Sequence, residues 1–122
     1  MRRRAARVGW VLALVLTPAL AVPHAFLVKS IPARRAVLVR APERVQLWFN
    51  ERLEPQFSRV SVWDAGGRQM DLADVQAGPD DPKRLSVGIP PLAAGTYVVK
   101  FRVLSVDGHV VEDQFPFTLR KP

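Results

Sequence analysis

Short runs of alternating apolar and polar residues are the feature of this sequence that most restricts its fold. In residues 44–50, the side chains of Val45, Leu47 and Phe49 fall on one face of an extended backbone, and the residues between them fall on the other. A side-chain period of two is typical of a β-strand that buries one face. Because no long stretch after residue 32 has a helical period, the core must be built from sheets.

Similar strands are expected further along the chain. Apolar residues alternate again in residues 58–63, and Asp64 to Gly67 then predicts a hairpin turn. Residues 74–84 are rich in Gly, Pro and Asp and have no apolar period, so they are expected to form a loop. A short strand is expected to follow at 85–89.

The longest apolar stretch lies near the end of the chain. Residues 95–104 and the alternating residues at 115–119 are expected to form paired central strands. About seven short strands, spaced roughly 8–12 residues apart and without helical crossovers, predict an all-β fold. The expected architecture is a Greek-key β-sandwich or a partly closed barrel.

The amino terminus has the organisation of an export signal. A basic segment at 1–7 precedes an uncharged apolar run at 8–22, which is shorter than the roughly 20 apolar residues of a membrane span. An A-L-A cleavage site occupies 19–21. We therefore predict a cleavable signal helix at 1–21 and one domain at 22–122, exported to the periplasm. An uncleaved membrane anchor is the alternative.

Composition narrows the chemistry of the exported domain. Its 101 residues suit one hydrophobic core. The leader carries four of the 18 basic residues and none of the 11 acidic ones, so its removal lowers the formal net charge from +7 to +3. The remaining basic residues are interleaved with acids, so nucleic acid is not an expected partner. Because the chain has no cysteine, any metal must bind through nitrogen and oxygen.

The only two histidines lie in segments that could bind a metal ion. Asp107 and His109 flank Gly108, whose freedom permits a tight turn that projects a carboxylate and an imidazole to the same side. Copper(II) prefers such ligands in a tetragonal arrangement. His24 would add a third ligand if the first strand lies beside this turn. An Asp-Gly turn followed by histidine is also common in solvated loops, so that interpretation stays open.

Four blocks of sequence together resemble the CopC family of copper-resistance proteins. They are His24 to Ala33, Val45 to Glu51, Gly95 to Val99 and Arg102 to Val111. The match as a whole follows the export leader and extends over essentially the whole exported domain. The resemblance implies a small periplasmic Greek-key β-sandwich or barrel of cupredoxin-like or immunoglobulin-like appearance. It also implies one copper(II) ion per chain, bound by Asp107, His109 and the ring and amino group of His24.

The resemblance further implies a role for Glu51 and bears on copper(I). Glu51 corresponds to a family carboxylate near the copper, which could orient a ligand through a hydrogen bond. A solvated acid at a strand end is the alternative. Some family members also hold copper(I) in a methionine-rich loop. This chain has only Met1, in the leader, and Met70, so no copper(I) methionine site is expected.

The residues before His24 depart from the family pattern. In the family, A-x-A directly precedes the histidine, whereas Val22 and Pro23 intervene here. Cleavage after Ala21 would leave the nitrogen of His24 in a peptide bond, and the chelate of amine and imidazole would be lost. Pro23 also blocks the alternative terminal chelate, because it has no N–H to lose. Cleavage or trimming directly before His24 would restore the family site.

Three functions are compatible with the sequence. The leading one is a periplasmic copper(II) carrier or buffer in copper homeostasis, resistance or transport, with an inner-membrane copper transport protein as the candidate partner. The second is an exported interaction module that has lost high-affinity metal binding and uses Trp48, Arg52 or Arg59 on an exposed face. The third, a copper oxygenase, would have little substrate surface. Because the chain carries no recognisable catalytic motif, we do not expect an enzyme.

Overall fold

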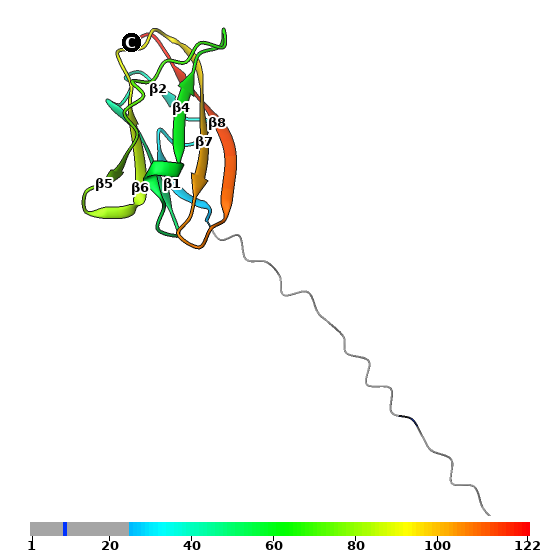
Figure 1. Ribbon diagram of the computed structural model, residues 1–122. Helices are drawn as coiled ribbons and strands as arrows, with labels where there is room; N and C mark the ends of the chain where they lie inside the picture. The colour runs from blue at the N-terminus through cyan, green and yellow to red at the C-terminus, as the bar shows by residue number, and fades with distance from the viewer. Residues whose placement is uncertain (1–8, 10–24) are drawn as a thin grey trace, which may run out of the picture.

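Eight β-strands and one short 3-10 helix form the part of the chain that the computed structural model describes, residues 9 and 25–122 (Figure 1). The strands are β1 (Leu27–Ile31), β2 (Val37–Leu38), β3 (Arg44–Phe49), β4 (Arg59–Trp63), β5 (Gln76–Gly78), β6 (Asp81–Gly88), β7 (Gly95–Leu104) and β8 (Val110–Leu119). The 3-10 helix η1 spans Pro55–Phe57. Within these described residues, no helix has the length and hydrophobicity needed to cross a membrane. The predicted leader at 1–21 lies outside them.

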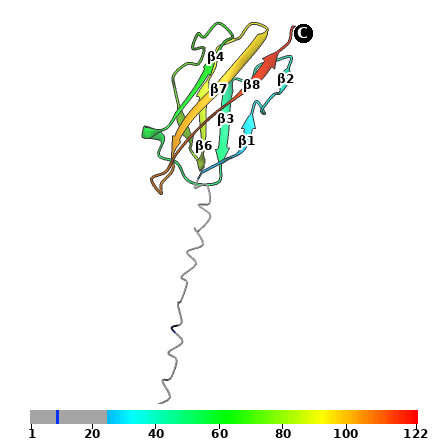
Figure 2. The ribbon, with the colours of Figure 1, turned by 90° about the vertical axis from the view of Figure 1, so that its right-hand side faces the viewer.

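The strands form two four-stranded sheets packed face to face (Figure 2). One sheet has the order β1-β3-β6-β5 and the other the order β2-β8-β7-β4. Neighbouring strands are antiparallel, except that β2 and β8 run parallel. The predicted all-β sandwich is therefore confirmed.

The core lies between the two sheets and follows the alternation in the sequence. Val45, Leu47 and Phe49 of β3 are at most 3% exposed. The alternate residues of β4, β7 and β8 face them from the other sheet, namely Val60, Val62, Tyr97, Val99, Phe101, Val103, Phe115, Phe117 and Leu119. Burying each such side chain stabilises the fold by about 1.5–3 kcal/mol. The Phe49 and Phe101 rings join the sheets edge to face, with centroids 5.4 Å apart.

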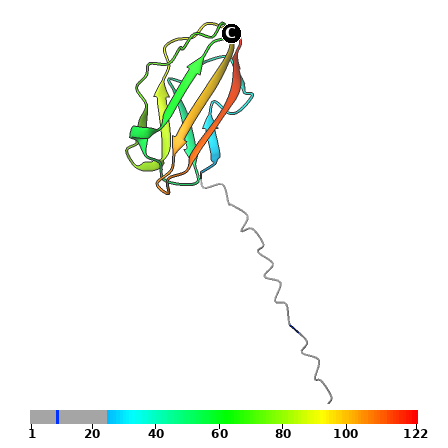
Figure 3. The ribbon, with the colours of Figure 1, turned by 45° about the vertical axis from the view of Figure 1, so that its right-hand side comes forward.

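The β7–β8 hairpin positions the candidate metal ligands. Ten residue pairs run from Gly95 and Leu119 at one end of the sandwich to Leu104 and Val110 at the other, a length of about 30 Å. The predicted pairing of these strands is confirmed. The turn at 105–109 closes this hairpin at the same end of the sandwich where the described chain begins, and the carboxyl terminus lies at the opposite end (Figures 1 and 3).

The prediction of a loop at 74–84 is wrong. This segment contains β5 and the first half of β6, and Gln76 pairs with Ser86. Only Pro79 and Asp80 connect the two strands, since Gly78 ends β5 and Asp81 and Pro82 begin β6. β5 is an edge strand with little apolar surface, so its pairing depends on β6 and leaves no period of two in the sequence.

The predicted turn at Asp64 to Gly67 is confirmed, with a hydrogen bond of 3.1 Å from the Gly67 N–H to the Asp64 carbonyl. The chain after the turn pairs with β4 through a single bridge, between Trp63 and Gln69. The Asp71 side chain accepts a hydrogen bond from the Val62 N–H at 2.9 Å, so a side chain replaces the missing strand at this edge of β4. The strand predicted at 58–63 is observed as β4.

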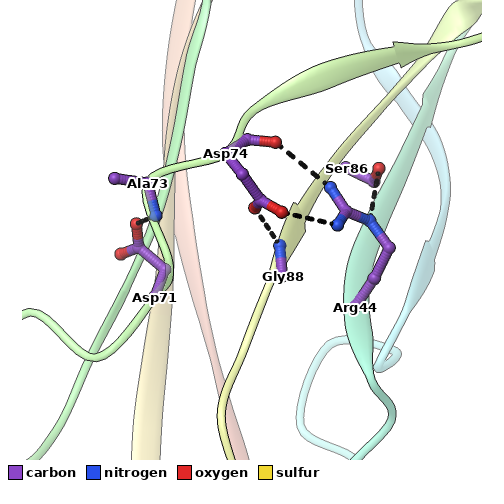
Figure 4. Close-up of polar contacts among 6 residues, drawn as sticks. All are labelled: Arg44, Asp71, Ala73, Asp74, Ser86 and Gly88. Carbon is purple, nitrogen blue, oxygen red and sulfur yellow. Dashed lines mark hydrogen bonds and ion pairs between the residues drawn. The ribbon is translucent and has the colours of Figure 1, made fainter.

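A cluster centred on Asp74 fixes the first sheet at the end opposite the 105–109 turn (Figure 4). The Asp74 carboxylate accepts hydrogen bonds from the Arg44 guanidinium at 2.8 Å and from the Gly88 N–H at 2.6 Å. Arg44 also donates to the Ser86 hydroxyl at 3.0 Å. The Arg44 guanidinium, together with the Gly88 N–H, holds the pKa of Asp74 below its usual value. This cluster links the start of β3 to the end of β6.

Candidate metal site

Asp107 and His109 lie together in the turn between β7 and β8. The Oδ1 atom of Asp107 is 3.2 Å from Nδ1 of His109 and accepts a hydrogen bond of 3.2 Å from the His109 N–H. Gly108 between them has a φ of 91°, in the left-handed region that glycine adopts without steric cost. The turn therefore brings the carboxylate and the imidazole to the same side, as the sequence predicts.

Backbone hydrogen bonds and the side chain of Ser105 hold the 105–109 turn together. The Ser105 N–H donates to the His109 carbonyl at 3.0 Å, and the Gly108 N–H donates to the Ser105 carbonyl at 2.9 Å. The Ser105 hydroxyl donates to Asp107 Oδ1, and Ser105 itself is 1% exposed. The His109 side chain is 57% exposed and that of Asp107 is 31% exposed. A buried hydroxyl thus orients a carboxylate that remains accessible from solvent.

The segment between β3 and β4, which crosses from one sheet to the other, supports this turn. Leu53 bridges to Ser105, and the Val106 N–H donates to the Arg52 carbonyl at 3.1 Å. The Ser58 hydroxyl accepts a hydrogen bond of 3.0 Å from the Leu104 N–H. The turn is therefore held to a rigid part of the fold, as a metal site requires.

Asn50 ties the start of the described chain to the same end of the sandwich. Its side-chain oxygen accepts a hydrogen bond from the Phe26 N–H at 2.6 Å, and its backbone N–H donates to the Phe26 carbonyl at 3.2 Å. Ala25 is 1% exposed and belongs to the core. The residue that directly follows His24 in the sequence is therefore fixed in place. His24 itself lies outside the described residues.

Glu51 follows Asn50 in the segment between β3 and β4. Its Oε2 atom is buried and has no hydrogen-bond partner in the described part of the chain. A buried carboxylate oxygen without a partner is costly, so this atom needs a donor or a cation. Of the two interpretations of Glu51, the burial of this oxygen favours a carboxylate that binds a neighbouring group over a fully solvated acid.

The described residues supply two of the three predicted ligands. They contain no group of three or more His, Cys, Asp or Glu side chains arranged to hold a metal ion. Asp107 and His109 are brought together, and the third predicted ligand is His24. Any complete site would therefore need a residue from outside the described part of the chain, or ligands from solvent.

The distance between the two candidate ligand atoms suits a divalent metal ion. First-row divalent ions bind nitrogen and oxygen at about 2.0–2.2 Å, so two ligands at a right angle are about 3 Å apart. Nδ1 of His109 and Oδ1 of Asp107 are 3.2 Å apart. An imidazole and a carboxylate also form the donor set that copper(II) prefers. The pair therefore has the separation and the donor atoms that two neighbouring ligands of such an ion would need.

Two supporting residues were not singled out from the sequence. Asn50 is predicted there only as an outward-facing strand residue, and Ser105 only as part of the turn. Asn50 accepts a hydrogen bond from Phe26, which is distant in the sequence. Ser105 orients Asp107 through a hydroxyl that is buried in the folded chain. An Asn at a strand end next to an acid, and a Ser two residues before Asp107, are the signals that point to these roles.

Residues 27–120 match the family model of the CopC domain. The chain belongs to the CopC family. It is 33% identical over 107 residues to the copper resistance protein C of Escherichia coli. The aligned region covers 82% of this chain and 84% of that protein. It is 34% identical over 112 residues to the copper resistance protein C of Pseudomonas syringae pv. tomato, covering 87% and 88%.

Solved CopC structures have the same fold as this chain. The crystal structure of CopC from Methylosinus trichosporium OB3b is 39% identical, with a TM-score of 0.75 over 80% of this chain and 95% of that one. The crystal structure of PcoC from Escherichia coli, described as a methionine-rich copper resistance protein, is 32% identical, with a TM-score of 0.70 over 80% and 99%. The present CopC chain has two methionines in its sequence.

The CopC domain also occurs as part of a larger protein. The copper transport protein CutJ of Bacillus subtilis is 30% identical over 109 residues, which are 88% of this chain but only 20% of CutJ. The chain therefore spans about a fifth of that relative's length, and the activity of CutJ as a whole does not transfer to it.

Proposed function

We propose that this protein binds one copper(II) ion in the periplasm through His24, Asp107 and His109 and acts as a copper carrier or buffer without enzymatic activity. The observation that carries the proposal is the pair of Asp107 and His109 in one turn, with Oδ1 and Nδ1 3.2 Å apart. The relatives named copper resistance and copper transport proteins support copper as the metal.

The position of Ala25 supports His24 as the third ligand. Ala25 is buried, and the Asn50 side chain fixes the next residue, Phe26, at the end of β3. Because His24 directly precedes Ala25 in the sequence, the anchored segment that begins at Ala25 supports the choice of His24 as a ligand. Glu51 follows Asn50 and has a buried oxygen that lacks a partner among the described residues. We propose that this oxygen accepts a hydrogen bond from a ligand and holds it in orientation.

The chain end determines how strong this site is. If the leader is removed directly before His24, the free amine and the imidazole can both bind copper(II). If Val22 and Pro23 remain, His24 can bind through its ring alone. The proposed carrier role requires an affinity that survives dilution in the periplasm, so the site with the free amine is the one we favour. Copper delivered from it would pass to a membrane copper transport protein.

Intact mass spectrometry of the protein from the periplasm, without and with one equivalent of copper(II), tests the proposal. We expect a mass that begins at His24 and increases by one copper ion. Electron paramagnetic resonance of the same sample should show a tetragonal copper(II) signal with nitrogen hyperfine structure. A mass that begins at Val22 and retains no copper would contradict the carrier role. It would favour the alternative, an interaction module that has lost metal binding.

A further inference from the structure

A groove of about 630 Å³ lies at the end of the sandwich opposite the metal turn. Its floor is apolar and includes Ile89 and Leu119, which are 6% and 5% exposed, and the half-buried Leu92. Grooves of this volume are typical of binding sites for small molecules and for the anchoring side chains of peptides. We call it the basic groove, because of the residues at its rim.

The rim of the basic groove is positively charged. Arg40, Arg120 and Lys121 are exposed there, and their side chains have no ion pair or hydrogen bond within residues 25–122. Glu43 is the acidic side chain among the lining residues. Among the side chains that line the groove, basic groups outnumber acidic ones by three to one. The groove thus favours a ligand with an apolar part and negative charge.

Hydrogen bonds fix the walls of the groove before any ligand binds. The Ile89 N–H donates to the Glu43 carbonyl at 3.0 Å. The residues next to these two, Arg44 and Gly88, are both held by the Asp74 carboxylate (Figure 4). A preformed groove binds more tightly than a flexible one, because less conformational entropy is lost.

An open strand edge adjoins the groove. β2 is the edge strand of its sheet, so among the described strands it pairs only with β8. The Arg120 N–H donates to the Leu38 carbonyl at 2.8 Å, so the backbone of Leu38 faces β8. The backbone N–H and C=O groups of the alternate residues, Val37 and Val39, therefore point away from β8. Val37 is 52% exposed and Val39 is 61% exposed. An extended peptide could therefore pair along this edge with apolar contacts.

We propose that the basic groove and the edge of β2 bind an extended acidic segment of a partner protein, which inserts an apolar side chain into the groove. The occupant is acidic because the rim carries unpaired cations. A second copy of this chain related by a two-fold axis would place these cations against one another, which is unfavourable.

The proposed surface is remote from the metal turn. The ten-residue hairpin of β7 and β8 separates the two by about 30 Å. A partner held at the basic groove would leave Asp107 and His109 open to solvent or to a second protein. This inference does not depend on copper binding, so the two proposals can fail independently.

The binding of a fluorescein-labelled peptide, Asp-Glu-Leu-Val-Asp-Glu, tests the proposal. Anisotropy is measured with protein purified from cells that express the full chain. We expect saturable binding that weakens at least about tenfold in the double variant R40E/R120E, since two attractive contacts become repulsive. Ala94 lines the groove and is exposed, so Ala94→Trp should fill the groove and weaken binding about fivefold without a change of charge.

The matched control is the double variant R59E/K83E. Both residues are exposed, neither lines the basic groove, and the change in net charge is the same. We expect less than about a twofold effect on the peptide and unchanged copper binding in all three variants. Absence of saturable binding, or equal losses in the two double variants, would overturn the proposal. Sedimentation that shows a dimer broken by R40E/R120E would also overturn it, in favour of a second copy.

Discussion

Two aspartates at opposite ends of the sandwich hold the chain by similar hydrogen bonds but differ in their partners. Asp74 accepts from the Gly88 N–H and from the guanidinium of Arg44. Asp107 accepts from the His109 N–H and lies beside the imidazole of the same residue. An arginine side chain stays charged at all relevant pH values and does not bind metals. An imidazole can lose its proton and become a metal ligand.

The difference matches the proposed division of roles, in which Asp74 stabilises the fold and Asp107 binds metal. The Asp74 carboxylate joins β3 to β6, so its charge is used within the protein. The Asp107 carboxylate is oriented by a buried hydroxyl, that of Ser105, and is directed toward a group suited to metals. A carboxylate paired with arginine therefore indicates a structural role. Under the proposed function, the carboxylate beside histidine has a binding role instead.

The largest expected effect comes from removing the imidazole. Replacing His109 by alanine should lower the affinity for copper(II) at least about a hundredfold, since loss of an outer partner alone costs about 10–100-fold. Because the side chain is 57% exposed, the free energy of unfolding without metal should change by less than about 0.5 kcal/mol. Competition titration with a copper(II) chelator and urea unfolding measure the two quantities.

The same pair of measurements on Asp74→Ala should give the opposite pattern. Copper affinity should stay within about twofold of the original, since Asp74 lies at the far end of the sandwich. The urea midpoint should fall, because Arg44 and the Gly88 N–H lose their acceptor. If Asp74→Ala weakened copper binding as much as His109→Ala, the separation of roles would be wrong.

Replacing either of two turn glycines should have an effect of intermediate size. Gly108 and Gly67 have φ values of 91° and 82°, and a Cβ atom added to either would meet no atom within 4 Å. Replacing each by alanine should therefore lower the free energy of unfolding by a similar amount, about 1 kcal/mol of backbone strain. Only Gly108→Ala should also weaken copper binding, several-fold, because it strains the turn that sets the distance between Asp107 and His109.

Thermal unfolding together with copper titration of both glycine variants checks this expectation. An equal loss of stability with an unequal loss of copper affinity would support it. If both variants kept full copper affinity, the geometry of the 105–109 turn would not control binding.

The smallest expected effect is the pH dependence of the Asp74 cluster. The pKa of Asp74 is lower in the folded protein than in the unfolded chain. The stability that its carboxylate contributes is therefore present above the pKa of the unfolded state and is lost as the pH falls through the pKa of the folded state. The urea midpoints of the original protein and of Asp74→Asn should therefore differ at pH 7 and converge below about pH 4. A difference that grew on acidification would contradict the assigned interaction.

Sequence patterns predicted the strands that carry core residues and failed for those that do not. Alternation located β3, β4, β7 and β8, because each buries every second side chain between the sheets. β5 was missed because it is short, lies at an edge and depends on β6 for its hydrogen bonds. The Gly and Pro residues around it predict a loop on local grounds alone.

The candidate site divides in the same way. The motif Asp107-Gly108-His109 and its resemblance to the CopC family pointed to a metal turn, and the pair is brought together in the structure. The roles of Asn50 and Ser105 were not predicted. The hydrogen bond of Asn50 joins residues far apart in the chain, and the role of Ser105 depends on its burial. Neither property follows from local sequence.

The sequence by itself determined which side chains of the alternating strands face the core and which turn carries the carboxylate and imidazole. It also determined that nitrogen and oxygen are the donor atoms available to a metal in a chain without cysteine. These properties follow from side-chain period, glycine conformation and donor chemistry, all of which are local. Only the tertiary structure decided that Asn50 fixes Phe26 at the end of β3. It also decided that Arg40, Arg120 and Lys121 meet around one apolar groove. Such contacts join residues far apart in the chain, and only strand pairing within each sheet and the packing of the sheets bring them together.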